Sequence, residues 1–523
     1  MTLTGSSTSV VVIGGGLAGI SAALELADAG LDVTLLEARP WLGGATCSFA
    51  RRGLTIDNGQ HVFLRSCSAY WDLLARLGVT ASCSLQGGLD LTVLSPATTA
   101  RVRRSGLPAP LHLARSLAGY RLLSPAERAK AGAAAMALQF VDAGSHDRTL
   151  GDWLARHGQD EHARRAFWDL LSLSALNISA ENADLSLAAS AITTALLARR
   201  GSADLGIPSV PLSQLHGGPA AALLSKLHVT VRLGVRAAAV QISPAGGYDI
   251  CLTYGTQGHA PASAGCEPVF GPGPAQINAA GIVLAVPPWD AAALVPGELA
   301  ADAANWSSLD PSPVISLHVI YGSQVTRLPF AAAVESPLHW VVDKTASAGL
   351  HAGQYLAASV RAADAYVDTP VAQLRWEFLP ALEQLFPAAT EATVTDFFVT
   401  RERRATIAHV PGSQRLRAMV ATEPAGFAVA GAWTDYGWPD TMEGAVRSGW
   451  AAALKVRAEL PARGAAAARP VLGRSPAARS SAAGSATEAR PPTLTQPQGS
   501  QVSTEVAEAA SADTVKHEMT STP

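Results

Sequence analysis

Three glycines near the amino terminus have the type and spacing of a phosphate-binding turn. The sequence Gly14-x-Gly16-x-x-Gly19 follows four apolar residues and leads into a helix-like stretch, and Leu17 and Ala18 within it are also candidate contacts of the ligand. Gly14 permits a tight turn, Gly16 lets a pyrophosphate approach the backbone, and Gly19 lets helix and strand pack closely. The first N–H groups of the helix and its dipole favour negative charge. This turn therefore predicts a bound dinucleotide.

The elements around this turn support the same prediction. Residues 10–13 and 32–37 are strand-like, and residues 18–29 between them have the apolar spacing of a helix. Glu37 ends the second strand, eighteen residues after Gly19. A carboxylate at that place accepts hydrogen bonds from the hydroxyls of an adenosine ribose. A tight turn without a ligand is the alternative, and the acid at the strand end favours the dinucleotide.

The residues after Glu37 bear on whether the dinucleotide is NAD or FAD. Ala38 and Arg39 are followed by the pair Gly43 and Gly44, which an NAD domain has no reason to carry and which could also be a plain loop. The E-x-R-x-x-x-G-G pattern resembles flavoproteins of the amine oxidase and phytoene desaturase superfamily. The resemblance implies FAD, with Arg39 and the glycine pair near its diphosphate and ribityl parts.

A second segment, close to the other end of the folded chain, resembles the same superfamily. Residues 429–453 read as a strand, a glycine, a loop and a helix. The resemblance implies that this segment closes over the flavin, with Gly431, Ala432 and Met442 as contacts, and that Val235 meets the adenine. Val235 could equally be an ordinary strand residue. Relatives carry an acid where this chain has Ala432, so one contact to the ribityl chain is missing.

The length and composition predict a globular protein with more than one core. The chain has 523 residues, of which 48% are apolar and 15% charged. Strand patterns that could share one sheet come from the start, the middle and the end of the chain. We expect an α/β fold, a Rossmann-like FAD-binding domain interrupted by a mixed helical and sheet substrate domain. The expected segments are FAD-binding at 1–100, 206–300 and 411–460, helical substrate domain at 101–205, substrate sheet at 301–410, and a disordered tail at 461–523.

Several classes of function and location are disfavoured. A net charge of −3 argues against nucleic acid as the main partner. The chain has five cysteines, which form no C-x-x-C pair and are interpreted as reduced thiols: Cys47, Cys67, Cys83, Cys251 and Cys266. No metal site is expected. We find no secretory signal and no apolar run of about 18 residues. The expected location is the cytoplasm, or the inner face of the cytoplasmic membrane.

Three further stretches narrow the resemblance within the superfamily. Residues 54–79, 107–128 and 210–240 resemble the hydroxysqualene dehydroxylases, or squalene-associated FAD-dependent desaturases, and the D-N-G-Q-H motif at 57–61 is the most distinctive. The resemblance covers nearly all of residues 9–458. It implies reductive removal of the allylic hydroxyl of hydroxysqualene, or of a related C30 isoprenoid, by hydride from reduced flavin. No second glycine-rich motif is present, so the electron donor is left unidentified.

Loss of a hydroxyl group requires a proton, and three side chains are candidate donors. His61 ranks first because it titrates nearest neutral pH and lies in the distinctive motif. It could instead be a structural histidine. Asp57 is the second candidate and could instead hold the following turn. Glu443 is the third and could simply complement the dipole of its own helix.

The substrate domain is expected to hold an apolar substrate. Phe167, Trp168, Leu171 and Leu176 are candidate lining residues, although helical spacing favours a plain core. Residues 101–130 carry seven basic side chains against one acid, interleaved with leucines. Such a stretch could rest on an anionic membrane surface, or it could be a solvated helix face.

Two other functions remain open at this stage. The first is a desaturase of the same superfamily that acts oxidatively on a polyprenyl hydrocarbon such as a carotene precursor. The second is a non-catalytic isoprenoid carrier on the same fold. The preserved flavin motif disfavours a carrier, and Ala432 is the one residue in its favour.

Overall fold

The computed structural model describes residues 2–3, 8–142, 144–254, 275–419 and 424–460. The predicted disordered tail at 461–523 and Cys266 lie outside these residues. Four cysteines within them are free thiols: Cys47, Cys67, Cys83 and Cys251. Within the same ranges, no helix has both the length and the apolar character needed to cross a bilayer.

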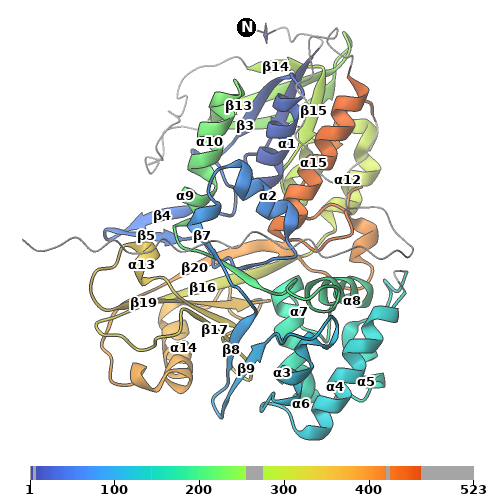
Figure 1. The fold of residues 1–523 in the computed structure, drawn as a ribbon. Helices are drawn as coiled ribbons and strands as arrows, with labels where there is room; N and C mark the ends of the chain where they lie inside the picture. The colour runs from blue at the N-terminus through green and yellow to red at the C-terminus, as the bar shows by residue number, and fades with distance from the viewer. Residues whose placement is uncertain (1, 4–7, 143, 255–274, 420–423, 461–523) are drawn as a thin grey trace, which may run out of the picture. The chain divides into compact units, whose positions relative to one another are not determined.

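A five-stranded parallel sheet forms the centre of the first domain (Figure 1). Its strands, in spatial order, are β11 (Thr230–Leu233), β3 (Asp32–Glu37), β2 (Ser9–Ile13), β15 (Gly281–Leu284) and β21 (Phe427–Val429). The strands are short and apolar, as expected for a sheet covered on both faces. Helices α1 (Leu17–Asp28) and α15 (Met442–Glu459) lie side by side over one face. The prediction that one sheet collects strands from the start, middle and end of the chain is confirmed.

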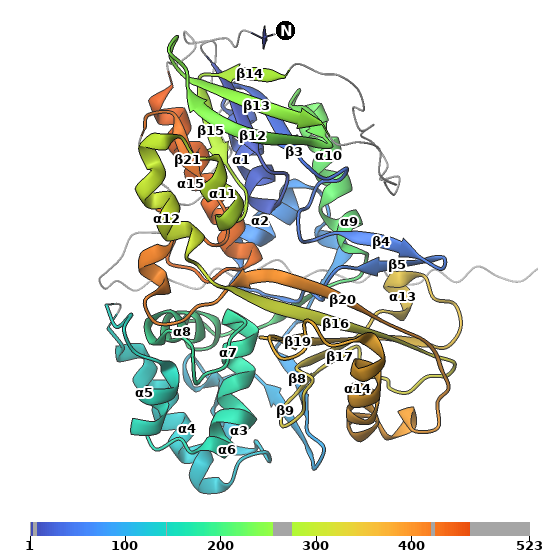
Figure 2. The same ribbon diagram turned by 180° about the vertical axis from the view of Figure 1, so that it is seen from behind.

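The other face of this sheet packs against a four-stranded sheet (Figure 2). That sheet has the order β1 (Thr2–Leu3), β14 (Gln276–Ala279), β13 (Tyr248–Tyr254) and β12 (Val235–Ile242). The sequence predicts one strand over residues 229–242, and this is wrong. Gly234, with φ +71°, turns the chain between β11 and β12, a conformation that favours glycine. The two halves therefore join different sheets.

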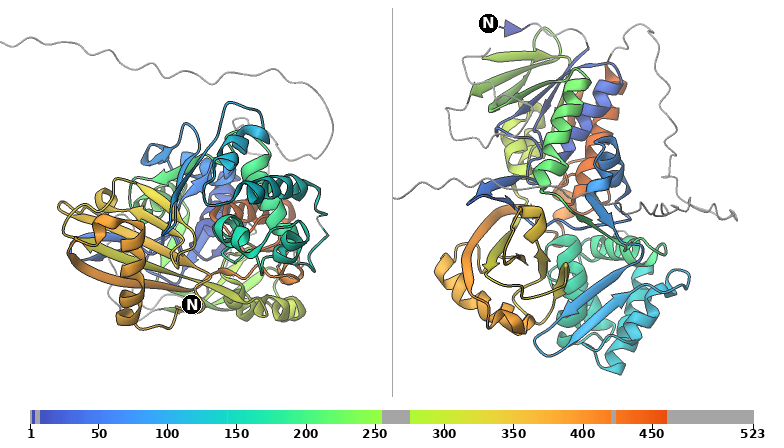
Figure 3. Two further views of the ribbon diagram at one scale, coloured as in Figure 1. Left: turned by 90° about the horizontal axis from the view of Figure 1, so that it is seen from below. Right: turned by 60° about the vertical axis from the view of Figure 1, so that its left-hand side comes forward.

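A seven-stranded mixed sheet organises the second domain (Figure 3). Its order is β20 (Val394–Ile407), β16 (Pro311–Tyr321), β19 (Gln354–Arg361), β18 (Trp340–Asp343), β17 (Phe330–Ala333), β8 (Asp90–Leu94) and β9 (Thr99–Arg103). Helix α14 (Val371–Leu385) covers one face through Leu374, Phe378 and Leu382. Because β8 and β9 belong to this sheet, the boundary predicted at residue 100 lies too late.

Helices cover the opposite face of the seven-stranded sheet and share a core with β8, β9 and β17. They are α3 (Ala114–Ala118), α4 (Pro125–Ala137), α5 (Leu150–Arg156), α6 (Glu161–Ala163), a π-helical turn over Arg164–Trp168, α7 (Asp169–Leu176) and α8 (Leu185–Ile192). Ser124 begins α4 with a capping box, its side chain bonded to the Glu127 backbone while the Glu127 carboxylate binds the Ser124 backbone. The predicted helical character of residues 107–200 is confirmed.

The remaining elements either pack against the sheets of the first domain or connect it to the second domain. They are the hairpin β4 (Ser48–Arg51) and β5 (Leu54–Asp57), the small sheet β6 (Phe63–Leu64), β10 (Leu205–Pro208) and β7 (Cys83–Leu85), and helices α2 (Ser68–Arg76), α9 (Leu212–Leu215), α10 (Gly217–Lys226), α11 (Pro288–Leu294), α12 (Ala300–Ser307) and α13 (Thr345–Ala348).

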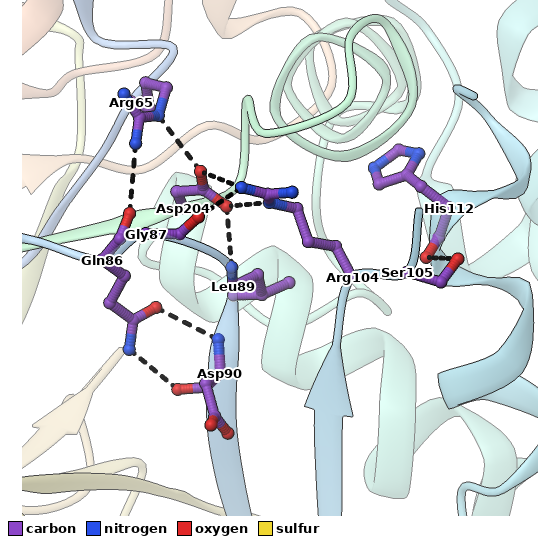
Figure 4. A network of polar contacts seen from close by, with 9 residues as sticks. All are labelled: Arg65, Gln86, Gly87, Leu89, Asp90, Arg104, Ser105, His112 and Asp204. Carbon is purple, nitrogen blue, oxygen red and sulfur yellow. Dashed lines mark hydrogen bonds and ion pairs between the residues drawn. The ribbon is translucent and has the colours of Figure 1, made fainter. Parts of the chain in front are cut away.

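One buried carboxylate ties these connections together (Figure 4). Asp204, just before β10, accepts hydrogen bonds from the Leu89 N–H at 2.7 Å and from the guanidinium groups of Arg65 and Arg104 at 3.1 and 2.7 Å. Asp204 is 1% exposed, so these charge-assisted bonds are shielded from water. They fix the start of β8 and of β10 to each other.

Candidate active site

The glycine-rich turn has the geometry that the sequence predicts. Gly14 has φ +111°, and a Cβ there would overlap the carbonyl oxygen of Ala285 in the neighbouring strand connection. A Cβ on Gly19 would overlap the carbonyl oxygen of Gly14. Each position therefore excludes any larger residue, and β2 and α1 pack as closely as backbones allow. The turn places the start of α1, with Leu17 and Ala18, at the carboxyl end of the parallel sheet.

Two glycine pairs, Gly15 with Gly16 and Gly43 with Gly44, face one another beside the start of α1. The Gly43 N–H donates to the Gly15 carbonyl at 2.8 Å, and a Cβ on Gly44 would lie 3.0 Å from the Gly16 Cα. No side chain caps α1 and no acid lies in its first turn, so its first N–H groups are left to a ligand. The buried Trp41 indole nitrogen beside the second pair has no partner among the described residues. These features fit a dinucleotide pyrophosphate.

Glu37 is buried at the end of β3, where the turn and the following loop meet. Its carboxylate accepts hydrogen bonds from the Gly15 and Arg39 N–H groups, both at 2.7 Å. Burial raises the pKa of Glu37 above its ordinary value, and these two N–H groups oppose that rise. Each carboxylate oxygen has a second acceptor site. The group can thus bind a ribose hydroxyl while it holds the turn.

The adjoining residues lie around the same strand end. Ala38 and Arg39 are exposed, and the Arg39 guanidinium donates to the Gly44 carbonyl at 3.2 Å. The Arg39 carbonyl accepts from the Gly234 N–H at 3.1 Å, which places Val235 next to the chain that leaves Glu37. Their predicted contacts with FAD stay predictions.

The second segment of the resemblance, residues 429–453, begins at the end of β21 and is held by an arginine that sequence reasoning missed. The Gly431 N–H donates to the Ser448 hydroxyl of α15 at 2.9 Å. The guanidinium of Arg417, 4% exposed, donates to the carbonyls of Ala432, Trp433, Thr434 and Trp438. One cation thereby orders the whole loop that leads to Met442 at the start of α15. Arginine bound to carbonyls leaves no spacing signal in a sequence.

Asp57 is fully engaged by three protein donors. One oxygen accepts from the Ser48 hydroxyl at 2.7 Å and the Leu212 N–H at 2.9 Å, and the other pairs with the Lys344 ammonium at 2.7 Å. Asp57 is 2% exposed and Lys344 is 7% exposed. The pair joins β5 of the first domain to the end of β18 in the second. This arrangement supports a structural role, and we leave Asp57 out of the proposed proton donors.

Glu443 also holds two elements together. Its carboxylate accepts from the Ala69 and Tyr70 N–H groups at 3.1 and 2.7 Å and from the Arg447 guanidinium at 2.6 Å. Ala69 and Tyr70 lie in the first turn of α2, so Glu443 caps that helix from α15. With 1% exposure and three donors, this side chain is committed to packing rather than to proton transfer.

His61 differs from the other two because its ring makes no hydrogen bond within the described chain. Burial, together with the smaller effects of the Arg361 and Lys344 cations, lowers the pKa of His61 to about 4 against the opposing effect of Asp57. The ring is therefore neutral near pH 7, and the reason for ranking it first, an ordinary pKa near neutrality, does not hold in this environment. A neutral imidazole can still donate one hydrogen bond to a substrate oxygen.

A cavity of about 390 Å³ opens beside the D-N-G-Q-H motif and runs between the helices and the seven-stranded sheet. Its walls are almost entirely apolar and come from β6, β8, α3, α4, α7, α8 and the sheet. Phe167 and Leu171 line it as predicted. Trp168 and Leu176 do not: both are core residues, and Trp168 is fully buried with its indole N–H on Gln159. The described residues thus form a dinucleotide turn in the first domain and an apolar chamber lined in part by Gln60 of the D-N-G-Q-H motif.

Comparison with known proteins agrees with this architecture. A family model described as flavin containing amine oxidoreductase matches residues 17–457. The chain belongs to the flavin-containing amine oxidoreductase family. A cyclohexylamine oxidase from Brevibacterium oxydans superimposes with a TM-score of 0.63 at 18% identity, over 87% of this chain and 99% of that one. The likeness confirms the predicted fold class.

Two relatives of this oxidoreductase have names that refer to isoprenoid substrates. Hydroxysqualene dehydroxylase from Rhodopseudomonas palustris is 28% identical over 462 residues, which are 85% of this chain and 97% of the relative. Zeta-carotene desaturase from Zea mays is 25% identical over 509 residues, covering 85% of this chain and 82% of the relative. The predicted superfamily and the predicted cofactor, FAD, are confirmed by the family and its flavoprotein neighbours.

Proposed function

We propose that this flavin-dependent oxidoreductase removes the allylic hydroxyl of hydroxysqualene reductively to give squalene. The observation that carries the proposal is the apolar cavity beside the D-N-G-Q-H motif. Its volume lies within the range of small-molecule sites, and its lining suits a hydrocarbon chain with few polar atoms. The hydroxysqualene dehydroxylase relative, which covers nearly the whole folded chain, supports the same substrate class.

The reaction exchanges a C–O bond for a C–H bond. One hydride and one proton are added to the substrate, water is released, and reduced flavin is oxidised. When bound, FAD supplies the hydride. The glycine turn, Glu37 and Arg39 would hold the dinucleotide. The apolar walls would keep water from an allylic cation, which water would otherwise recapture.

Anaerobic incubation with hydroxysqualene and chemically reduced FAD tests the proposal. Chemical reduction removes the need to know the electron donor, which we expect to be a free nicotinamide or a partner protein. The expected result is squalene, identified by mass spectrometry, formed in proportion to enzyme. Absence of squalene with a correctly folded, flavin-loaded enzyme would refute the dehydroxylase function.

A desaturase that acts on a carotene precursor is the second candidate. The maize relative, similar over 85% of this chain, favours it. Phytoene and ζ-carotene offered to the oxidised enzyme, with an electron acceptor, separate the two functions. Formation of additional conjugated double bonds, with hydroxysqualene untouched, would establish the second candidate. The flavoprotein family disfavours the third function considered, a non-catalytic carrier.

We further propose that the mouth of the cavity docks on an anionic membrane at the cytoplasmic face. Leu111 and Met136 line the cavity and are also 53% and 41% exposed. Leu107 and Phe140, each four residues away along the chain from one of them, are 49% and 86% exposed. A hydrocarbon substrate dissolved in a bilayer would enter the cavity past these side chains.

The basic side chains of this stretch divide into two groups. Arg101 and Arg103 pair with Asp90, Arg104 pairs with Asp204, and Arg128 binds carbonyls, so these four are structural. Arg115, Arg121 and Lys130 are exposed and make no ion pair with any described residue. These three remain available for anionic headgroups.

Flotation with vesicles tests the docking surface. We expect the protein to float with vesicles containing phosphatidylglycerol and to lose that binding in the double variant Leu111→Ser, Phe140→Ser. Trp376→Ser, which removes a side chain 79% exposed on α14, is the matched control and should float normally. Equal flotation of all three proteins would contradict a membrane contact at this mouth.

A further inference from the structure

The polar side chains that line the apolar cavity fall into two groups. Those among the helices have protein partners. The Ser116 hydroxyl exchanges hydrogen bonds with the Arg103 backbone, the Tyr120 hydroxyl donates to the Ala166 carbonyl, and the Ser174 hydroxyl donates to the Leu170 carbonyl. These groups are satisfied within the protein and have no need of a ligand.

The second group has no such partners. Gln60, Ser359 and Arg361 line the same cavity, and none of their side chains hydrogen-bonds to a residue that the structure describes. The Gln60 amide nitrogen and the Arg361 Nε are buried and unpartnered. Gln60 lies in the D-N-G-Q-H motif, and the other two lie at the end of β19, so two domains contribute to one polar cluster.

Arg361 is the one charged residue among those that line the cavity. The structure records no carboxylate that pairs with its guanidinium, and burial lowers the pKa of Arg361 to about 10. Its charge reaches His61 and His339, and it lowers the pKa of both. An unpaired cation in an apolar wall is costly unless a ligand supplies an acceptor. Among the described residues that line the chamber, there is no carboxylate, and none accepts a hydrogen bond from this guanidinium.

We infer that Arg361, together with Gln60 and Ser359, forms the site that binds the hydroxyl oxygen of a long-chain isoprenoid alcohol. A guanidinium presents five N–H donors and no acceptor, so its partner must bring lone pairs. The cluster would orient the alcohol by its oxygen while the hydrocarbon lies along the apolar walls. It would also stabilise negative charge on that oxygen as the C–O bond breaks. The inference deepens the proposed function and rests on it for the identity of the alcohol.

Binding to the oxidised holoenzyme tests the inference without turnover, because the oxidised flavin has no hydride to give. Dissociation constants for hydroxysqualene and for squalene are measured in the same detergent, and their ratio is the readout. A charge-assisted hydrogen bond predicts that the wild type binds the alcohol about 10- to 100-fold more tightly than the hydrocarbon.

Three variants decide the outcome. Arg361→Met should weaken the binding of hydroxysqualene but not that of squalene, which brings the ratio of the two dissociation constants close to one. Arg361→Lys, which keeps a cation with fewer donors, should restore part of it. Arg403→Met, an exposed arginine of β20 paired with Asp368, is the control and should keep the wild-type ratio. Melting curves and the flavin absorption spectrum establish that each variant is folded and loaded.

An unchanged ratio in Arg361→Met would overturn the inference. If the flavin spectrum of that ligand-free variant is shifted as well, the result would assign Arg361 to the flavin instead. These outcomes are separate from failure of the proposed function. A wild type that discriminates alcohol from hydrocarbon but forms no squalene would refute the reaction and keep the binding site.

Discussion

Replacing Asp57 by asparagine should destabilise the protein because it leaves a buried ammonium without its counter-ion. Asp57 and Lys344 lie 2.7 Å apart, 2% and 7% exposed. At an effective dielectric constant of about 20, two unit charges at that distance attract by about 6 kcal/mol. In the intact pair, the free energy of desolvation offsets much of that attraction. When one partner is lost, the other charge stays buried and its desolvation is no longer compensated. Removal of one member of a buried pair typically costs about 3–5 kcal/mol.

A double-mutant cycle measures this coupling. We expect Asp57→Asn and Lys344→Met each to lower the free energy of unfolding by several kcal/mol, and the double variant to recover most of the loss. The assay is thermal unfolding of the FAD-loaded protein, followed by flavin release and by circular dichroism. The pair Arg52 and Asp396, whose arginine side chain is 70% exposed, provides the matched control, and its cycle should show less than about 1 kcal/mol.

The same variants separate a structural role of Asp57 from a chemical one. If Asp57 only holds the domains together, the double variant regains turnover along with stability. Recovery of stability without recovery of turnover would show that the carboxylate takes part in the reaction. Additive losses in the double variant would refute the reasoning altogether, because they would mean that the two groups do not interact.

Three further predictions follow from single positions. Gly44→Ala places a methyl group against the opposing glycine turn and should weaken FAD binding about tenfold, measured by flavin fluorescence; Gly53→Ala, with a similar positive φ and open space around it, should not. His61 has a folded pKa near 4 against 6.5, so its stabilising contribution is complete above about pH 6.5 and is lost as pH falls toward 4. The melting temperature of the His61→Asn variant should therefore decrease less than that of the wild type as the pH falls from about 6.5 to 4. His351→Asn, which replaces an exposed histidine, should not reduce this decrease. Glu443→Gln should lower the melting temperature through α2 while turnover per bound flavin stays within about twofold, and a larger loss of turnover would contradict its capping role.

Local pattern was enough to predict the dinucleotide turn and the parallel strands. Gly14, Gly19 and Glu37 act within one strand–helix–strand unit, so their roles depend on residues close in the sequence. The buried parallel strands are continuous apolar runs, which stand out from their surroundings. The predicted segment 1–100 includes β8, whose place in the second sheet is set by pairing with β17, more than two hundred residues later.

The charged groups of the site could not be predicted in the same way. Lys344 meets Asp57 across almost three hundred residues, and Arg417 binds carbonyl groups that every sequence contains. Within the described part of the chain, the Arg361 guanidinium has no protein partner to search for. The pKa of His61 departs from the expected one for a related reason, since burial and residues distant in the sequence set it. Electrostatic environment is a property of the folded chain, whereas periodicity is a property of the sequence.

The order of strands in the parallel sheet also determines when the protein can fold during synthesis. β2 pairs with β15, which is synthesised about 270 residues later, and β15 pairs with β21 near the end of the described chain. Until then, β2 and α1 have β3 beside them but lack β15 and α15, which cover their remaining apolar surface. Pairing between such distant segments is slow, and apolar surface that is prone to aggregation stays exposed in the meantime. A nascent chain of this protein therefore depends on protection from aggregation until almost all of the flavin domain has left the ribosome.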